Sequence, residues 1–400
     1  MRGLFTDTSR NVYNWYGTIT DRKFSGGEIV SSGNELHIYT KVATGKLTAA
    51  YRFSDKFRII FSNTLQHYDR HGKDTVAQRY YGGVDFFGTS SSLTKNIAGL
   101  GLEGALTPKL RFTTAVKYLL AQLHGSTLEW NTQTLVSQNL HDVAYNAALA
   151  YRLTGPVLLK ASFEHAVRLP EAEEAFGDLM LIRSNPRLVP EISGNINLNV
   201  LYNKNGLNIE ATGFFRKVDN IIYLRPALTS AIYQNLLKSR VKGAEAAVVY
   251  TPITWLTVQG NITFQDLRNR SYIDGSGINN DRYKNARLPN IPYLFANGGA
   301  MFSKKDWPAK RTGFQLWYNT AYTHEYFLYW EVDGARELKN RIPMQLLHYT
   351  GVSCLLPQYG LSLAFEINNL ANQTVYDNFK AQLPGRSYSL KVRFYKAKEL

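Results

Sequence analysis

The sequence predicts an all-β protein, an antiparallel transmembrane β-barrel built as a meander. Three observations indicate this class. Apolar and polar residues alternate with a period of two, the alternating segments run for about 10–15 residues, and short turns alternate strictly with long loops from residue 54 to residue 384. Because strands of soluble sheets are usually about 5–6 residues long, the segment length favours a membrane barrel.

The period of two is clearest in four segments, each with apolar residues on one face and polar or small residues on the other. These segments are residues 195–200, 256–265, 361–367 and 388–394. In the first of them, Asn195, Asn197 and Asn199 share a face. Three asparagines in a dry core would each need a hydrogen-bond partner, whereas a wet lumen supplies water. We therefore expect the polar face to line a lumen.

The predicted connections fall into two classes, and we expect each class at one end of the meander. The short turns carry the Gly, Pro, Asn and Asp typical of hairpins. They lie at 54–56, 107–109, 153–155, 203–206, 251–254 and 357–360. The long loops are expected at 71–91, 125–140, 169–192, 226–238, 269–290, 326–342 and 371–384. The best helical stretch, residues 170–176, falls inside one of these loops.

Aromatic residues flank the short turns, which is typical of the girdle at a membrane interface. They are Tyr51, Phe53, Phe57, Tyr151, Tyr202, Tyr250 and Trp255. A soluble β-sandwich or propeller also alternates apolar and polar residues. The length of the segments, this girdle and the asparagine row favour the membrane barrel over it.

The composition excludes several classes of protein. The single cysteine in 400 residues excludes an intrachain disulfide and any multi-cysteine metal site. With 44% hydrophobic residues the chain is not disordered. No apolar run approaches the roughly 18 residues of a spanning helix. The net charge of +15 is scattered rather than gathered in a stripe, so we expect no nucleic-acid partner.

No catalytic or metal-binding pattern stands out. Neither G-x-S-x-G nor a Walker motif occurs, and the glycines of residues 99–104 fit G-x-G-x-x-G only by letter, inside an expected strand. His67 and His71 would lie about 13 Å apart on a strand, too far to share a metal ion. We expect no enzyme activity, no cofactor and no metal site.

Several short motifs follow one another in order from about residue 160 to the end of the chain. Arg168-Leu-Pro begins the series, an Asn-Pro…Pro-Glu segment follows, and an Asn-Asn-Leu…Pro-Gly-Arg segment closes it. The motif positions are Arg168, Pro170, Asn185, Pro186, Pro190, Glu191, Asn235, Gly243, Glu245, Asn369, Leu370, Pro384, Gly385 and Arg386. In this order and spacing they resemble the C-terminal barrel of TonB-dependent outer-membrane receptors.

The resemblance implies a barrel of 22 strands around a plugged lumen, of which we count about fifteen or sixteen. Residues 1–33 are then a loop or strand remnant of the upstream barrel, and residues 34–400 form the C-terminal portion. The family's insertion signal falls on the final strand, at Tyr388, Leu390, Val392 and Phe394, although further residues follow it here. The plug domain and a signal peptide are not recognised, so we expect either a fragment, whose true start is not Met1, or the product of a truncated gene.

The resemblance also implies function: TonB-energised uptake of a scarce nutrient through the outer membrane of a Gram-negative cell, usually a ferric siderophore or similar iron chelate. The implied partners are outer-membrane lipid and lipopolysaccharide, the barrel-assembly machinery, the iron chelate, and the TonB complex through the plug. A plug-less structural or adhesive barrel and a soluble all-β binding domain stay open as alternatives.

Candidate ligand contacts lie in the long loops. Exposed aromatic side chains can stack on a ligand, and arginines can attract an anionic ferric chelate. The aromatic candidates are Tyr80, Tyr81, Phe86, Phe87, Tyr326, Phe327, Tyr329 and Trp330, and the arginines are Arg168, Arg183 and Arg187. The competing interpretation for the aromatic residues is packing between loops. For the arginines it is simple solvation.

Overall fold

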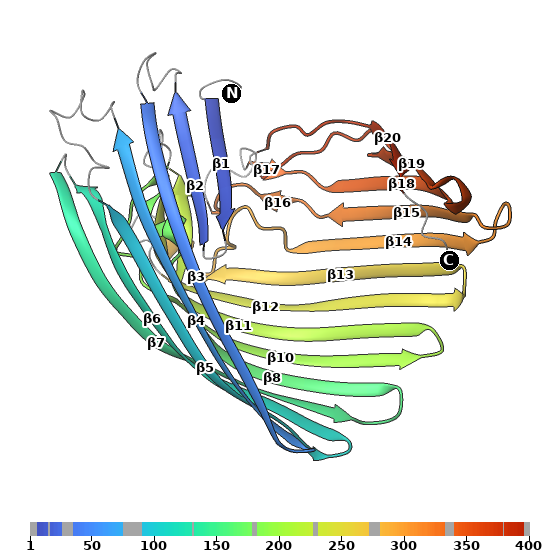
Figure 1. Cartoon of the computed structure of the whole chain (residues 1–400), viewed down its shortest axis with the longest axis horizontal. Helices are drawn as coiled ribbons and strands as arrows, with labels where there is room; N and C mark the ends of the chain where they lie inside the picture. Colours follow the sequence, from blue (N-terminus) through green and yellow to red (C-terminus); the bar gives the residue numbers. More distant parts are fainter. Residues whose placement is uncertain are drawn as a thin grey trace.

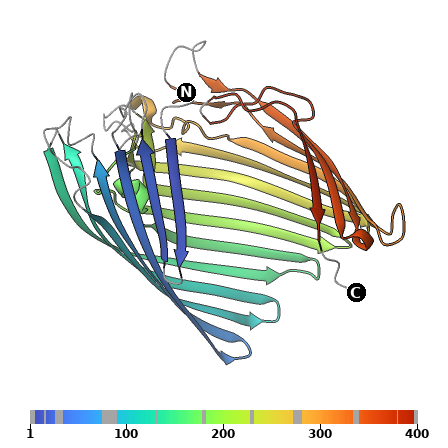
Figure 2. The ribbon, with the colours of Figure 1, turned by 45° about the horizontal axis from the view of Figure 1, so that its top comes forward.

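The computed structural model describes the chain in ten segments. They are residues 6–14, 17–25, 35–74, 90–129, 132–177, 182–226, 231–271, 281–332, 340–378 and 380–395. These residues form one large antiparallel sheet that curls into an open trough (Figures 1 and 2). The predicted all-β meander is confirmed.

Seventeen strands of eight residues or more build the described part of the sheet. They are β1 (Thr6–Asn14), β2 (Gly17–Ser25), β3 (Glu35–Ser54), β4 (Phe57–Asp74), β5 (Ser91–Thr107), β6 (Leu110–Glu129), β7 (Thr132–Arg152), β8 (Val157–Arg168), β10 (Glu191–Lys204), β11 (Leu207–Pro226), β12 (Ala231–Ile253), β13 (Leu256–Asn269), β14 (Leu294–Lys305), β15 (Gly313–Thr323), β18 (Gln345–Leu356), β19 (Leu361–Asn368) and β20 (Ser387–Phe394). Short elements lie in the connections: α2 (Ala172–Phe176), β9 (Ile182–Arg183), β16 (Tyr326–Phe327), β17 (Arg341–Ile342), and the 3-10 turns η1 (Asp281–Tyr283) and η3 (Pro357–Tyr359).

Each long strand pairs with the next long strand along the chain, as a meander requires. Within the described residues no pairing joins β1 to β20, so the sheet has two edges there. The count exceeds fifteen or sixteen because residues 6–25 form two strands, where the sequence indicates at most one. The sequence of β1, TDTSRNVYN, has no apolar face, so periodicity does not reveal it.

Two of the predicted long loops are wrong. β6 and β7 continue through most of 125–140, and β11 and β12 through most of 226–238. Polar residues dominate the ends of β6 and β7, and apolar and polar residues mix on both faces at the ends of β11 and β12, so neither pair of ends alternates with a period of two. Backbone hydrogen bonds to the neighbouring strands hold the ladder there without an apolar face.

Short turns gather at one end of the trough and long connections at the other (Figure 1). The turn between β10 and β11 illustrates the short class. Asn205 and Gly206 both have positive φ, at 52° and 76°, as a two-residue hairpin of matching twist requires. A side chain on Gly206 would come within 2.5 Å of the Thr251 carbonyl oxygen.

The two faces of the sheet differ as predicted. On β10, Leu198 is 62% exposed, and Ile196 and Val200 beside it are exposed too. On the opposite face Asn197 donates to Ser162, and Asn199 donates to Glu210 and Thr212. We call the apolar side the outer face and the polar side, which lines the trough, the concave face. Apolar side chains left uncovered this way suit contact with lipid rather than water.

The outer face continues to the final strand. Tyr388, Leu390, Val392 and Phe394 all lie exposed on β20. The expected aromatic girdle forms at the short-turn end of the sheet. It includes the ring pairs Phe53–Phe57, Phe57–Phe112, Trp255–Phe302 and Trp307–Phe314, with centroids between 4.8 and 6.2 Å apart. No helix in the described ranges is long and apolar enough to cross a membrane.

Candidate ligand-binding site

The connection between β8 and β10 folds back onto the concave face. Its short helix α2 and the residues before it place Leu169 and Phe176 against Leu93, Leu119 and Leu123 of β5 and β6, all buried. This cluster is the main apolar core that the described residues form on the concave side. The connection is therefore a packed shelf on the wall of the trough.

Local sequence explains why α2 begins and ends where it does. The backbone N–H of Glu171 donates to the Glu174 carboxylate, which satisfies one of the free donors at the start of the helix. Gly177, with φ of 60°, ends it, and its N–H donates to the Glu173 carbonyl oxygen. A side chain at Gly177 would collide with the backbone of Ile182.

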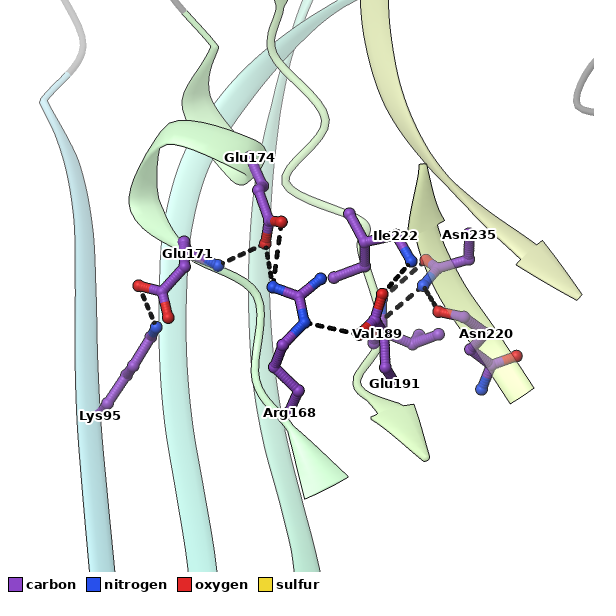
Figure 3. A network of polar contacts seen from close by, with 9 residues as sticks. All are labelled: Lys95, Arg168, Glu171, Glu174, Val189, Glu191, Asn220, Ile222 and Asn235. Atoms are coloured by element: carbon purple, nitrogen blue, oxygen red, sulfur yellow. Dashed lines mark hydrogen bonds and ion pairs between the residues drawn. The ribbon is translucent and has the colours of Figure 1, made fainter. Parts of the chain in front are cut away.

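An ionic network ties this shelf to the wall, and Figure 3 shows it. The Arg168 guanidinium, at the end of β8, lies 2.9 Å from a carboxylate oxygen of Glu174 and 2.6 Å from one of Glu191. Glu191 stands directly opposite Arg168 in the strand register. Its second oxygen accepts the backbone N–H of Ile222 on β11. One arginine thus links α2, β8, β10 and β11.

A second ion pair anchors the start of the shelf. The Lys95 ammonium of β5 lies 2.7 Å from Glu171, and the Lys95 side chain is only 4% exposed whereas that of Glu171 is 52% exposed. Sequence reasoning missed Lys95, Glu171 and Glu174. The available signal was a lysine at an inward position between Leu93 and Ile97, together with the acidic stretch before Phe176.

The end of the shelf is held by motif residues. The Asn235 amide on β12 donates to the carbonyl oxygens of Val189 and Asn220 at 3.0 and 2.7 Å, and its oxygen accepts the Val189 N–H. Asn185 donates to the Tyr233 carbonyl oxygen at 2.7 Å. Pro170 and Pro186 are fully buried, and Pro190 is half-buried.

Two further motif positions lie on the concave face of β12. Gly243 leaves room for the Phe214 ring, which a side chain there would approach to 2.5 Å. The Arg216 guanidinium stacks over the same ring, 5.2 Å from its centroid. Glu245 follows on the same face, paired in register with Thr212 and Thr263.

Three other long connections join at a second junction, on the β13–β20 side of the trough. The backbone N–H of Asn290 donates to the Phe327 carbonyl oxygen, and its side-chain amide donates to the Asn378 carbonyl oxygen. Arg341 stacks over the Phe327 ring and pairs with Glu325 at 2.9 Å. The loops are therefore packed against one another through β16 and β17.

Tyr326 lies inside this second junction. Its side chain is 6% exposed, and its hydroxyl donates to Asn378 at 3.4 Å. Burial raises the pKa of the Tyr326 phenol, and the nearby Asp377 carboxylate raises it further. Tyr326 is thus held neutral within the packed loops.

The closing motif shapes the connection between β19 and β20. Asn369, with φ of 51°, accepts the backbone N–H of Gln373 and donates back to its carbonyl oxygen. The side-chain oxygen of Asn372 accepts a hydrogen bond from the backbone N–H of Arg386, and Gly385 leaves room for the Asn372 side chain. Leu370 bonds through its backbone to His348, and Pro384 is exposed.

The predicted ligand contacts separate into three groups. Tyr80, Tyr81, Phe86 and Phe87 lie outside the described residues. Arg168, Tyr326 and Phe327 hold loops together, and Trp330 meets Tyr283 edge-on at 5.3 Å. Arg183, Arg187 and Tyr329 are exposed, Tyr329 by 59%. Across the described part of the chain, no three His, Cys, Asp or Glu side chains gather closely enough to hold a metal ion.

An antiparallel meander with an apolar outer face, a polar trough and loops gathered at one end is the architecture of the wall of a transmembrane β-barrel. The family model described as "TonB dependent receptor-like, beta-barrel" matches residues 3–370. The chain belongs to this family. No curated protein matches the sequence.

Solved structures of the same architecture are similar to this chain. They include the copper transporter OprC (TM-score 0.72, 14% identity, 94% of this chain and 61% of that one). The FrpB iron transporter from Neisseria meningitidis (F5-1 variant) has a TM-score of 0.67 at 11% identity, covering 97% and 62%. The siderophore receptor PiuA from Acinetobacter baumannii has 0.67 at 14%, covering 95% and 62%. The chain therefore spans about three-fifths of the length of these neighbours.

Proposed function

We propose that the chain is the barrel portion of an outer-membrane receptor that takes up a scarce nutrient with energy from the TonB complex. The observation that carries this proposal is the packed loop shelf at the long-loop end of a lipid-facing sheet, in a chain of the TonB-dependent receptor family. Such a wall can hold a binding surface rigidly while leaving a polar path through the trough. We propose a transporter rather than an enzyme.

The remaining partners follow from the same architecture. The TonB complex would act through a plug domain seated against the concave face. The barrel-assembly machinery would bind the exposed aromatic end of β20. The apolar outer face would contact outer-membrane lipid and lipopolysaccharide. We assign residues 1–33 to the upstream barrel and residues 34–400 to its C-terminal portion, within a longer receptor.

For the nutrient we propose an iron chelate of the ferric siderophore type. Two similar structures are named an iron transporter and a siderophore receptor, which supports this class, whereas a third is named a copper transporter. Arg183 and Arg187 on the shelf are exposed cations that would attract an anionic chelate, and Tyr329 offers an exposed ring for stacking.

The test measures binding of a panel of catecholate and hydroxamate ferric siderophores to the complete receptor. We expect Arg183→Gln combined with Arg187→Gln to weaken binding of an anionic member about tenfold, with surface expression unchanged. Lys304→Gln with Lys305→Gln, at the short-turn end, is the matched control. If both double variants bind the chelate equally, the arginines do not contribute to the binding site. If the receptor binds no ferric chelate, the proposed nutrient class is refuted.

The outer face favours this proposal over a soluble all-β domain. Leu149, Leu198 and Phe264 would each be left in contact with water, and the apolar area would drive aggregation. A plug-less adhesive barrel shares the outer face, but the inward-folded shelf is better suited to a ligand that enters the trough.

A further inference from the structure

The outer face of β10–β13 is hollowed by a groove. Its floor is formed by small residues facing each other in register, namely Ala211 and Gly213 of β11 with Ala246 and Ala244 of β12. Its walls are Leu198, Val200, Ile262 and Phe264, from β10 and β13. The groove has a volume of about 860 Å³ and apolar walls. It lies on the side that faces lipid.

A basic cluster continues the groove toward the long-loop end. On the same two strands and the same face, Phe215 pairs with Lys242 and Lys217 pairs with Arg240. Lys217 is four residues beyond Gly213, about 13 Å along the strand. The cluster of Lys217, Arg240 and Lys242 therefore lies directly above the groove.

These three cations lack carboxylate partners within the described residues. Lys217 and Lys242 are exposed, and the Lys217 ammonium lies 6.0 Å from the Phe215 ring centroid. The Nε atom of Arg240 is buried without a hydrogen-bond partner. Two acids lie nearby by register. Asp266 stands directly opposite Lys242, but it is bound by Arg268 at 2.7 Å and lies 3.8 Å from Arg287, and Asp219 stands opposite Lys238. The outer face here keeps an excess of positive charge.

We propose that the groove and the basic cluster together bind one phosphate-bearing, multiply acylated lipid of the outer leaflet. An acyl chain would occupy the groove, and the phosphate would lie against Lys217, Arg240 and Lys242. Between apolar surfaces in a bilayer, close packing rather than water exclusion favours association, and small residues permit that packing. The basic cluster adds attraction for an anionic head group and selects the lipid by charge. The inference rests on the proposed outer-membrane location and is independent of the imported nutrient.

The test measures lipid retention by native mass spectrometry on the receptor extracted from outer membranes in mild detergent. The probes are the phosphorylated glycolipid of the outer leaflet, the same glycolipid after dephosphorylation, and inorganic phosphate. Each cation removed should weaken binding about fivefold, so K217Q/R240Q/K242Q should weaken it about 100-fold. K304Q/K305Q/K310Q, near the short-turn end, is the matched control and should bind as the wild type does.

A second variant tests the groove separately. Gly213→Leu fills its floor, and a Cβ added there meets no atom within 4 Å, so the backbone of the sheet should still form. We expect this variant to retain the phosphorylated glycolipid at least about tenfold less well, because the acyl chain loses its packing. Gly45→Leu, where an added Cβ also meets no atom within 4 Å, is the matched control on β3.

Four results of the retention measurements would overturn the proposal, and a fifth concerns the oligomeric state. The four are unchanged retention in the triple variant, unchanged retention in Gly213→Leu, equal retention of the dephosphorylated glycolipid, and displacement of the lipid by inorganic phosphate alone. A groove filled by a second copy would appear as a dimer that Gly213→Leu dissociates without loss of lipid, and that result would overturn it too. Because the dephosphorylated probe needs only the wild-type protein, the test holds even if a variant fails to fold. Chelate uptake that persists in a variant that has lost lipid would separate this inference from the proposed function.

Discussion

The two partners of the Lys95–Glu171 ion pair differ in exposure. Removing one partner should therefore destabilise the shelf more than removing the other. Lys95 is almost fully buried, whereas the Glu171 side chain is half-exposed. Glu171→Gln leaves a buried ammonium without its counter-ion, which should destabilise the shelf by about 2–3 kcal/mol. Lys95→Met leaves a carboxylate that water can solvate, and places an apolar side chain beside Leu93 and Tyr68. Its cost should stay within about 1 kcal/mol.

Hydrogen exchange of the shelf amides measures both costs. The Ala175 N–H donates to the backbone carbonyl oxygen of Glu171, and the Asn185 N–H donates to that of Ala175. Both amides therefore exchange when the shelf opens. Glu171→Gln should speed their exchange roughly 30- to 150-fold, and Lys95→Met about fivefold or less.

The double variant Lys95→Met/Glu171→Gln completes the cycle. It should exchange more slowly than Glu171→Gln alone, because it no longer buries an unpaired charge. Amides in the β10–β11 ladder serve as the control and should not change. If Lys95→Met opens the shelf as much as Glu171→Gln does, burial does not set the energy of this pair and the reasoning is refuted.

Three further outcomes are expected. Gly243→Ala should destabilise the sheet by about 1–3 kcal/mol through collision with the Phe264 carbonyl oxygen and the Phe214 ring, seen as a lower melting point by circular dichroism, whereas Gly213→Ala in open space should not. Because burial raises the pKa of Tyr326, the second junction should lose stability as the pH rises above about 10, and Tyr326→Phe should abolish that loss in Trp330 fluorescence. Tyr329→Ala should weaken chelate binding without changing the melting point, because its ring is exposed; a lower melting point would contradict that assignment.

Local chemistry allowed much of the wall to be predicted from sequence. Alternation identified both faces of β10, Asn205 and Gly206 marked a hairpin, and the acidic run after Pro170 marked a short helix in a loop. Each of these features depends on residues within a few positions of one another. Such signals remain visible without knowledge of which strands pair.

The hydrogen bonds and ion pairs that hold the loops could not be predicted from local sequence. Asn235 bonds to Val189, 46 residues earlier, and Lys95 on β5 pairs with Glu171, with β6, β7 and β8 between them in the chain. Motif spacing pointed to Arg168 and Glu191 as separate positions, but only the register between β8 and β10 places them opposite each other. Arg168 was therefore expected to attract a ligand, although its guanidinium is engaged by two carboxylates.

The same long-range ties bear on the order in which the wall assembles. The shelf contacts β5 at Lys95 and β12 at Asn235, so its anchors are complete only after the strands between them have paired. Contacts of such high sequence separation form late, because the chain between them must first lose its freedom. A nascent wall would thus carry an open connection after β8 until β12 arrives. Docking of that connection would mark, within the growing sheet, the moment at which this half of the wall becomes rigid.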